Sequence, residues 1–337
     1  MNQNLLLKAM KRPETYDESV EDIRIVQTHI SWVFLTGKFA YKIKKPVNFG
    51  FLDFTTLEKR KYFCEREVEI NRRFSPEIYL GVLPLAEKAG NIKLGGEGKV
   101  LEYVVKMREI PQECLMSEKL ERGEVCKRDM EKIADILLRF YEKTERGRRI
   151  ERFGSPEMIW FNWEENFRQT RGFLGKTIDE KSFRMVKQYV EGFLERNRKL
   201  FLDRIKEGKV LWCHGDLHSG NIFLEDGKVW IFDAIEFNER FACSDVASDI
   251  AFLVMDVEFR GKKTLSDYFV KKYLEKSGDS GLEKLLDFYK CYRAYVRGKV
   301  TSFRLMEKGI SEEEREKAIS LARRYFEYCS KIAESSC

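Results

Sequence analysis

The sequence predicts an α+β fold in two parts: an antiparallel sheet with one helix, followed by a mostly helical part that contains a strand hairpin. Three observations support this. Strand-forming runs alternate with turns over residues 23–45, apolar residues recur with a helical period after Glu113, and two short apolar runs flank residues 225–228. With 337 residues, 43% of them hydrophobic, the chain can bury a core in each part. We expect residues 1–108 and 109–337 to form the two domains.

The first part is expected to contain five strands and one helix. Its strands are rich in β-branched and aromatic residues and are separated by turns such as Thr36-Gly37. Thr55 or Thr56 suits the start of the helix, and Ser75-Pro76 follows its end. The strands are predicted at residues 23–28, 31–35, 39–44, 78–85 and 100–107, the helix up to about residue 74, and a glycine-rich hairpin loop at residues 91–98.

The second part is expected to be helical before and after one strand region. Residues 289–303 mix basic and aromatic side chains, and we interpret the aromatic ones as core residues rather than as a surface that stacks on nucleic-acid bases. Helices are predicted around residues 130–141, at 155–172 and 179–207, after Ser244 as a cap, and as three amphipathic helices between residues 264 and 334.

The strand region between residues 210 and 233 concentrates the polar residues that suggest chemistry. Apolar strands at residues 210–213, 222–224 and 229–232 surround a polar loop at 214–220, and Asp226-Gly227 supplies a tight hairpin turn. The hairpin should hold Asn221 and Asp233 at one end, beside the loop that carries Asp216. Carboxylate and carboxamide oxygens suit Mg²⁺, and a carboxylate free of the metal can accept a proton from an attacking hydroxyl. These are the parts needed for phosphoryl transfer.

The loop His214-Gly215-Asp216-Leu217-His218-Ser219-Gly220-Asn221 resembles the catalytic loop of the aminoglycoside phosphotransferase family, and Ile231-Phe232-Asp233 resembles its metal-binding strand end. The resemblance implies a protein-kinase-like fold of two lobes, with a nucleotide-binding lobe first and a catalytic and substrate lobe second. It implies Asp216 as catalytic base and Asn221 and Asp233 as Mg²⁺ ligands. The alternative is that these residues only cap turns. For His218 both interpretations stay open. The chain looks closest to uncharacterised bacterial and archaeal members.

The same resemblance assigns the nucleotide-binding residues. Phe39-Ala40-Tyr41-Lys42 resembles the kinase strand whose lysine holds phosphates, so Lys42 takes that role, with Lys44 as its rival on the same strand face. The glutamate that orients this lysine is assigned to Glu67 on the helix. Residues 104–108 match the position of the hinge, where Met107 would pack near adenine. Ser31, in the first turn, is a candidate phosphate contact. For each of these the alternative is an ordinary solvated or packed residue.

Three departures distinguish the chain from other kinases. The first hairpin lacks a Gly-x-Gly-x-x-Gly loop, and no P-loop motif is present. Only about a dozen residues separate Asp233 from the next helix, where Asp249-Ile250-Ala251 resembles the segment whose aspartate steadies the catalytic loop. A protein kinase has a longer activation segment there. Glu236, within this short segment, is a candidate for approaching the metal or the acceptor.

Composition excludes several classes of protein. A net charge of +6 is a mild excess for this length and does not indicate nucleic acid as a partner. Three histidines, and eight cysteines without Cys-x-x-Cys spacing, argue against a zinc site and a disulfide framework. No run approaches the roughly 20 apolar residues of a membrane span, and residues 1–12 lack a signal-peptide layout. We therefore expect a cytoplasmic location and no membrane partner.

The sequence thus predicts a phosphotransferase that uses ATP or GTP with Mg²⁺ and acts on a hydroxyl of a small molecule. Acidic residues after Asp233, namely Glu236, Glu239 and Asp245, suggest a cationic acceptor. The alternatives are an atypical protein kinase and a non-catalytic module that binds nucleotide or nucleic acid. The acceptor, the choice between ATP and GTP, and the oligomeric state cannot be predicted from the sequence.

Overall fold

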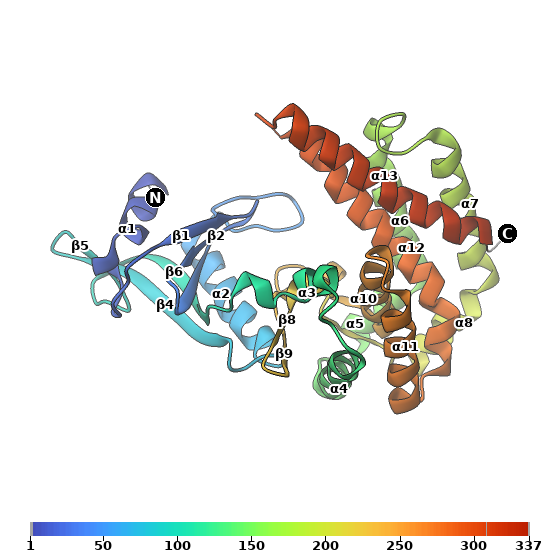
Figure 1. Cartoon of the computed structure of the whole chain (residues 1–337), viewed down its shortest axis with the longest axis horizontal. Helices are drawn as coiled ribbons and strands as arrows, with labels where there is room; N and C mark the ends of the chain where they lie inside the picture. The colour runs from blue at the N-terminus through green and yellow to red at the C-terminus, as the bar shows by residue number, and fades with distance from the viewer. Residues whose placement is uncertain (1–2, 308, 336–337) are drawn as a thin grey trace. The chain divides into compact units, whose positions relative to one another are not determined.

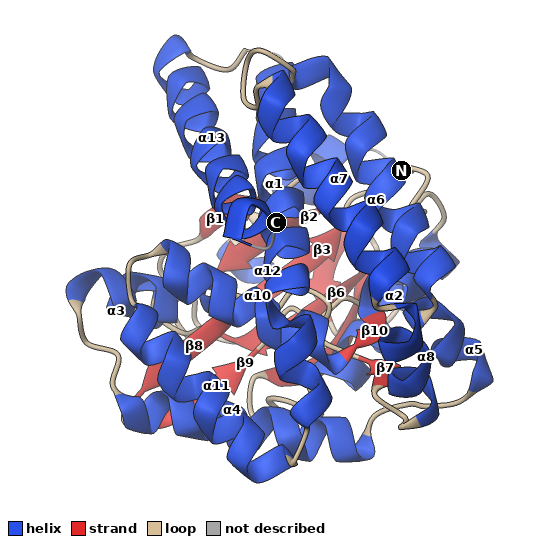
Figure 2. Ribbon diagram, turned by 90° about the vertical axis from the view of Figure 1, so that its right-hand side faces the viewer, coloured by secondary structure: helices blue, strands red, loops and turns tan. Residues whose placement is uncertain are grey.

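The structure is a computed structural model that describes residues 3–307 and 309–335. The chain divides into two compact units. The first comprises the described residues up to Glu118 together with Asn221–Asn238, and the second comprises Lys119–Gly220 and the described residues from Glu239 onward. The predicted α+β fold class is confirmed: the first unit holds the antiparallel sheet, and the second is mostly helical (Figures 1 and 2).

The first unit contains a six-stranded antiparallel sheet in the order β1-β2-β3-β6-β4-β5. All five predicted strands are present. The prediction of residues 91–98 as loop was wrong for β5, because four residues between glycine-containing turns give too short a pattern to recognise as a strand. The strands are β1 (Arg24–Gln27), β2 (Ser31–Leu35), β3 (Phe39–Lys44), β4 (Tyr79–Lys88), β5 (Asn91–Leu94) and β6 (Lys99–Arg108).

Helix α2 (Leu57–Asn71) packs against β4 and β6 (Figure 1). Of the two predicted caps, Thr56 is used: its hydroxyl accepts a hydrogen bond from Lys59 N at 3.2 Å. The helix ends three residues earlier than predicted. The other helices of this unit are α1 (Gln3–Met10) and the start of α3 (Met116–Arg122), along which the chain passes into the second unit.

The predicted hairpin is confirmed as β8 (Ile222–Glu225) and β9 (Lys228–Ile231). Asp226 and Gly227 both have positive φ, 49° and 69°, as a two-residue turn between twisted strands requires. The hairpin is fixed to the rest of the first unit by Ser75, whose hydroxyl donates to Ile231 O at 2.8 Å and accepts from Ile231 N at 3.0 Å. This anchoring sets the position of the residues that follow β9.

The second unit consists of helices and one short two-stranded sheet, β7 paired with β10 (Figure 2). Helices α10 and α12 pack together, and α12 and α13 run side by side. The elements are α4 (Lys127–Lys143), α5 (Arg148–Glu151), α6 (Pro156–Thr170), α7 (Glu180–Arg196), α8 (Arg198–Lys206), β7 (Val210–Trp212), α9 (Glu239–Ala242), β10 (Cys243–Asp245), α10 (Val246–Phe259), α11 (Lys263–Ser277), α12 (Ser280–Phe303) and α13 (Glu312–Ser335).

Two predictions about these helices were wrong. The single helix expected over residues 179–207 is broken at Asn197, where φ is −108° and ψ is 16°, outside the helical region. Asparagine competes with helix geometry through its own side chain, which here donates to Phe193 O. The cap of α10 is Asp245 rather than Ser244, since the Asp245 carboxylate accepts from Ala247 N at 2.8 Å.

The basic and aromatic stretch at 289–303 lies on α12, and two of its tyrosines, Tyr289 and Tyr295, are core residues as predicted. Tyr289 is 4% exposed and Tyr295 is fully buried. Tyr295 packs edge-on against Trp163 of α6, with ring centroids 5.4 Å apart. These rings are therefore unavailable to stack on bases.

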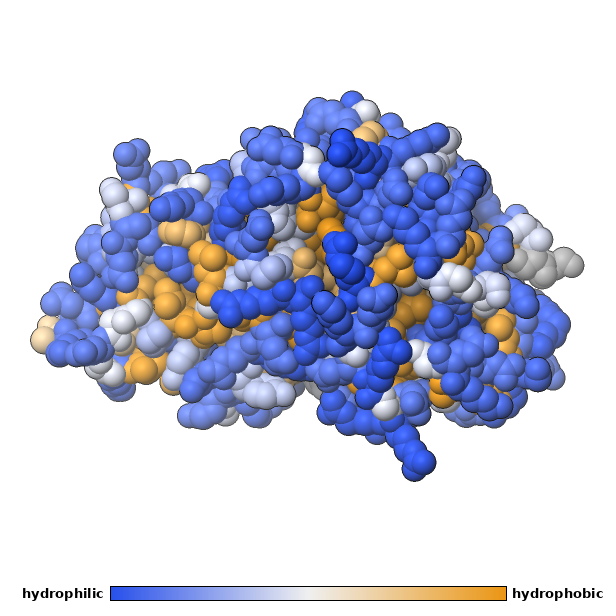
Figure 3. All heavy atoms as spheres, turned by 90° about the horizontal axis from the view of Figure 1, so that it is seen from below, coloured by the Kyte–Doolittle hydropathy of each residue, from blue (hydrophilic) through white to orange (hydrophobic). Residues whose placement is uncertain are grey.

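The face of the molecule shown in Figure 3 is largely hydrophilic, as expected for a chain in which 35% of residues are charged. Within residues 3–307 and 309–335, no helix combines the length and the apolar character needed to cross a membrane.

The buried ion pairs of Arg204 give a stability prediction. Its guanidinium binds Asp245 through Nε at 2.8 Å and Nη2 at 2.6 Å, and also pairs with Asp279. Arg204→Met strands two buried carboxylates, so we expect the free energy of unfolding in urea to fall by about 3–5 kcal/mol. Lys199→Met on the same helix is the control: this lysine is 92% exposed, and we expect a change within about 0.5 kcal/mol. Equal effects of the two substitutions would contradict the prediction.

Candidate functional site

In the first unit, two lysines share one glutamate. Lys42 and Lys44 lie two residues apart on β3, so their side chains project from the same face of the sheet. Glu67 reaches both from α2. Its Oε1 accepts from Lys42 Nζ at 2.8 Å, and its Oε2 accepts from Lys44 Nζ at 2.7 Å. The sequence left open which lysine would meet this glutamate, and the structure pairs it with both.

Each lysine also binds a second carboxylate from the segment after β9. Lys42 Nζ lies 2.7 Å from Asp233 Oδ1, and Lys44 is ion-paired with Glu236. The five side chains therefore form a row of alternating charge, in the order Asp233, Lys42, Glu67, Lys44, Glu236. We call this row the ion-pair ladder. Three carboxylates and two ammonium groups give it a net charge of −1.

The two ends of the ladder differ in their access to solvent. The Asp233 side chain is 48% exposed and that of Lys42 is 13% exposed. Glu67 is fully buried, and Lys44 and Glu236 are 1% and 5% exposed. Only the Asp233–Lys42 end can meet a ligand without rearrangement.

The ladder holds its central groups in their charged forms. Burial alone would lower the pKa of Lys42, but the negative charges of Asp233 and Glu67 raise it well above its usual value. Burial would raise the pKa of Glu67, but the charges and hydrogen bonds of Lys42 and Lys44 hold it below its usual range. A lysine that stays charged at neutral pH and is oriented by an ionised glutamate is suited to binding an anion such as phosphate.

The backbone that carries Asp233 is held by side chains of α2 and β4. Asp233 adopts a left-handed conformation with φ of 61°, which aspartate tolerates better than most residues. Its N–H donates to Tyr79 Oη at 3.0 Å, and the next N–H, that of Ala234, donates to Asn71 Oδ1 at 2.8 Å. These bonds fix the direction in which the Asp233 carboxylate points.

Asn221 and Asp233 lie at the same end of the hairpin, as predicted, since the carbonyl of Asn221 accepts from Phe232 N at 3.1 Å. Within the described residues, no group of three or more His, Cys, Asp or Glu side chains is arranged to hold a metal. A carboxamide and a half-exposed carboxylate nevertheless fit Mg²⁺, which commonly takes one or two protein oxygens and fills its shell with water and phosphate oxygens.

The two remaining nucleotide candidates lie within the sheet. Ser31 begins β2 and is 1% exposed, and its hydroxyl has no hydrogen-bond partner. A phosphate can therefore reach it only if the first hairpin moves. Met107 lies near the end of β6, where it is partly buried and packs against a cluster that includes Val105 and Tyr79.

In the second unit, the loop that carries Asp216 is fixed through its backbone. The Asp249 carboxylate, on α10, accepts from His214 N at 2.6 Å and from Gly215 N at 2.9 Å. From α12, Arg293 Nη1 donates to Gly215 O at 2.8 Å. The role expected of Asp249, steadying this loop by hydrogen bonds, is confirmed.

Asp216 itself remains accessible, with 40% of its side chain exposed. His218 Nε2 lies 3.5 Å from its Oδ2, while His218 Nδ1 accepts from Gly220 N at 3.1 Å. Burial would raise the pKa of Asp216, but the charge and hydrogen bond of His218 and the charge of Arg297 hold it well below its usual value. The carboxylate is therefore ionised at neutral pH, as a proton acceptor must be.

Several residues that support these groups were not predicted. Asp256 accepts from Ser219 N at 2.9 Å and so holds the far end of the Asp216 loop. It lies seven residues after Asp249, two turns along the same face of α10, and this spacing was a usable signal. For Asn71, Tyr79 and Arg293 the sequence offers no local signal, because their partners are distant in the chain.

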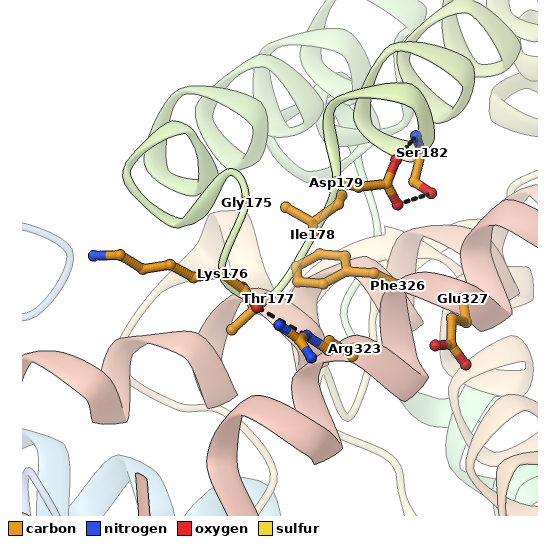
Figure 4. A pocket seen from close by; sticks show the side chains of 9 residues that line it. All are labelled: Gly175, Lys176, Thr177, Ile178, Asp179, Ser182, Arg323, Phe326 and Glu327. Carbon is orange, nitrogen blue, oxygen red and sulfur yellow. Dashed lines mark hydrogen bonds between the residues drawn. The ribbon is translucent and has the colours of Figure 1, made fainter. Parts of the chain in front are cut away.

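A pocket of about 200 Å³ lies elsewhere in the second unit (Figure 4). Arg323, on its wall, donates from Nε to Lys176 O at 2.9 Å, and Asp179 caps α7 through Ser182 N. Its lining, within the described residues, includes none of the predicted site residues. Both of these polar contacts are made within the protein, and we assign the pocket no part in the candidate site.

These features are those of a kinase-like fold. One unit has an antiparallel sheet whose lysines bind a helix glutamate, and the other is helical and carries a loop with an aspartate. The resemblance to the aminoglycoside phosphotransferase family is confirmed, because residues 145–287 match the model of the phosphotransferase enzyme family, APH. An uncharacterised protein of Mycobacterium tuberculosis (strain ATCC 25618 / H37Rv) is 36% identical over 291 residues. The match covers 86% of this chain and 56% of that protein, so the chain spans about half the length of the curated relatives it matches.

Solved structures confirm the fold. The GDP and kanamycin complex of APH(2")-IIia superposes with a TM-score of 0.53 at 10% identity, covering 96% of this chain and 98% of the other. A choline kinase from Cryptosporidium parvum Iowa II gives 0.53 at 10% identity, covering 99% and 94%. At this level of identity the likeness establishes architecture alone.

The Asp249 contacts predict how tightly the Asp216 loop is held. Asp249→Ala removes both acceptors, so we expect the amides of His214 and Gly215 to exchange with deuterium about tenfold faster or more, because local opening becomes easier. Asp249→Asn keeps one acceptor oxygen and should fall between this variant and the wild type. Mass spectrometry of the peptide spanning residues 210–218 measures the effect. Asp135→Asn, on α4, is the control, because this carboxylate pairs with Lys276 instead of the loop. Unchanged exchange in Asp249→Ala would refute the assignment.

Proposed function

We propose that this protein is a Mg²⁺-dependent phosphotransferase that moves the terminal phosphoryl group of ATP or GTP to a hydroxyl of a small molecule. The observation that carries this proposal is the open end of the ion-pair ladder, where Lys42 is fixed by Glu67 beside Asp233. Phosphoryl transfer requires mainly positioning and charge neutralisation, and this arrangement supplies both. Transfer to small molecules rather than proteins is supported by the short segment between Asp233 and α10.

On the nucleotide side, Lys42 is the residue proposed to bind phosphate. Its side chain is the more exposed of the two, at 13% against 1% for Lys44, and Glu67 restricts where its ammonium can point. Lys44, sealed between two carboxylates, is unsuited to that role. Asn221 and Asp233 would hold Mg²⁺, which when bound neutralises phosphate charge and orients the transferring group.

On the acceptor side, Asp216 is the proposed base. It would accept a hydrogen bond from the acceptor hydroxyl, orient it for attack and take its proton as the phosphoryl group is transferred. The backbone bonds from Asp249 and Arg293 hold the loop during this step, so that little reorganisation is required. The exposed carboxylate leaves room for the hydroxyl to approach.

The three acidic residues that suggested a cationic acceptor give that idea no support. Glu236 and Asp245 are buried and paired with Lys44 and Arg204, and Glu239 binds Arg149 Nη1 at 2.7 Å. Their charges are neutralised within the protein. The proposal therefore specifies a hydroxyl-bearing acceptor and leaves its charge open.

Calorimetry of nucleotide binding, with and without Mg²⁺, tests the proposal. We expect the wild type to bind ATP or GTP in a Mg²⁺-dependent manner, and Asp233→Ala to lose at least about tenfold in affinity with Mg²⁺, because a metal ligand is removed. Asp216→Asn should bind nucleotide as the wild type does, since this residue is assigned to the acceptor. A parallel screen for ADP or GDP release across hydroxylated compounds should identify an acceptor, and Asp216→Asn should fail to turn it over. Absence of nucleotide binding in the wild type would refute the proposal.

The charge environment of Asp216 predicts a pH effect on turnover. Its pKa is held low partly by His218, so His218→Asn should raise that pKa and move the acid limb of the kcat profile to higher pH. The sign follows because the active form is the ionised carboxylate, which then persists only at higher pH. Profiles that extend below about pH 4, where aspartate carboxylates titrate, measure the shift. Lys276→Gln, at an exposed site of the same unit, should leave the limb in place. A limb that stays fixed or moves to lower pH in His218→Asn would contradict the assignment.

A further inference from the structure

The inner half of the ion-pair ladder has no role in the proposed chemistry. Lys44 and Glu236 are 1% and 5% exposed, so neither can contact nucleotide, metal or acceptor as the protein stands. Yet each is charged and buried, which is costly unless the pair is well matched. Apolar side chains would fill the same space at no such cost. The presence of this pair therefore calls for an explanation beyond stability.

One contact of the inner pair bears directly on Glu67. A buried carboxylate needs partners for both oxygens, and Lys42 satisfies only Oε1. Lys44 binds Oε2 at 2.7 Å and so fixes the rotation of the carboxylate plane. Without it, Glu67 could turn away from Lys42 or draw that ammonium deeper into the protein.

The other contact bears on the segment that carries Asp233. Glu236 lies three residues after Asp233, and its ion pair with Lys44 ties that segment to β3. Before Asp233 in the chain, the hydrogen bond from Ile231 N to Ser75 Oγ anchors the end of β9 to the segment after α2. Asp233, in its left-handed conformation, is thus held on both sides.

The outer pair must change partners if it works as proposed. Lys42 and Asp233 bind each other at 2.7 Å, whereas phosphate binding by Lys42 and metal binding by Asp233 each compete with that contact. When it breaks, the ladder loses the ion pair that joins its outer end to the sheet. The inner pair, Lys44 and Glu236, does not take part in this exchange. It can keep Glu67 and residues 234–236 in position while the outer pair changes partners.

We propose that Lys44 and Glu236 form a positioning pair that holds Glu67 and the Asp233 segment in place while Lys42 and Asp233 turn from each other to nucleotide and metal. The proposal rests on the proposed function. It assigns to this site two residues that act through Glu67 and Asp233 rather than on the substrate.

The experiment compares Glu236→Gln, Lys44→Met and the double variant Lys44→Met/Glu236→Met. Lys44→Met leaves the buried Glu236 carboxylate without its ion pair, and Glu236→Gln removes one of the two carboxylates that bind Lys44, so both should lower the unfolding temperature. The double variant removes both charges and keeps the net charge of the ladder. It should regain the part of that loss that comes from the unpaired Glu236 carboxylate, while Oε2 of Glu67 still lacks the partner that Lys44 supplied. Positioning predicts that the kcat of the double variant nevertheless stays at least about tenfold below wild type, because small displacements of reacting groups are costly, with a smaller change in nucleotide KM. A merely structural pair predicts that kcat recovers together with the unfolding temperature.

Glu102→Gln is the matched control. Glu102 is another buried carboxylate of the first unit, 1% exposed, and its Oε2 accepts from Arg60 Nε of helix α2 at 2.8 Å. Its loss should also lower the unfolding temperature, because it leaves the buried Arg60 guanidinium without this carboxylate. It should leave kcat within about twofold of wild type, because Arg60 lies two turns from Glu67 and outside the ladder.

Deuterium exchange of the Asp233 and Ala234 amides gives a readout that needs no activity. We expect the double variant, despite its partly recovered stability, to exchange both amides about tenfold faster than wild type, with Glu102→Gln unchanged at these positions. If wild-type protein binds no nucleotide, the proposed function fails, and this exchange arm alone still decides whether the pair positions the segment. Unchanged exchange in the double variant, or recovery of its kcat with its stability, would overturn the inference.

Discussion

The carboxylate of Glu67, shared between two lysines, is the interaction on which the candidate site depends. Lys42 and Lys44 come from one face of β3, and like charges so close together are tolerated only because a negative group lies between them. The outer carboxylates of Asp233 and Glu236 complete the neutralisation from the segment after β9. These ion pairs connect strand β3, helix α2 and the segment after β9. Most of them are buried, where the low dielectric strengthens the attraction between charges.

The aspartate loop of the second unit is held by a different physical means. Its position comes from backbone hydrogen bonds to buried carboxylates of α10: Asp249 accepts from two N–H groups at one end of the loop, and Asp256 accepts from Ser219 at the other. Because these bonds use the main chain, none of them involves the side chain of Asp216. The charged form of Asp216 is then favoured by His218 and Arg297. The loop is thus held in place by bonds that do not involve the Asp216 carboxylate.

Most of the elements could be predicted from the sequence because their signals are local, whereas the site residues were nominated through the resemblance of short motifs to a known family. Alternating strands, the Asp226-Gly227 turn and the Thr56 cap each depend on neighbours a few residues away. The errors were local too: β5 was too short to show a pattern, Asn197 interrupts a continuous helical period, and Asp245 rather than Ser244 caps α10. The roles assigned to Asp216, Asn221, Asp233, Lys42 and Glu67 remain predictions.

The sequence by itself determined which residue types could do the chemistry and which of them share a strand or helix face, since spacing alone decides that. It placed Lys42 and Lys44 on one face of β3 but could not divide their roles. The tertiary structure decided that Lys44 is sealed by Glu236, a residue 192 positions away, while Lys42 stays accessible. The physical reason is that burial and ion pairing depend on how distant segments pack. The local sequence pattern does not indicate which of the two lysines will be buried when the distant segments pack.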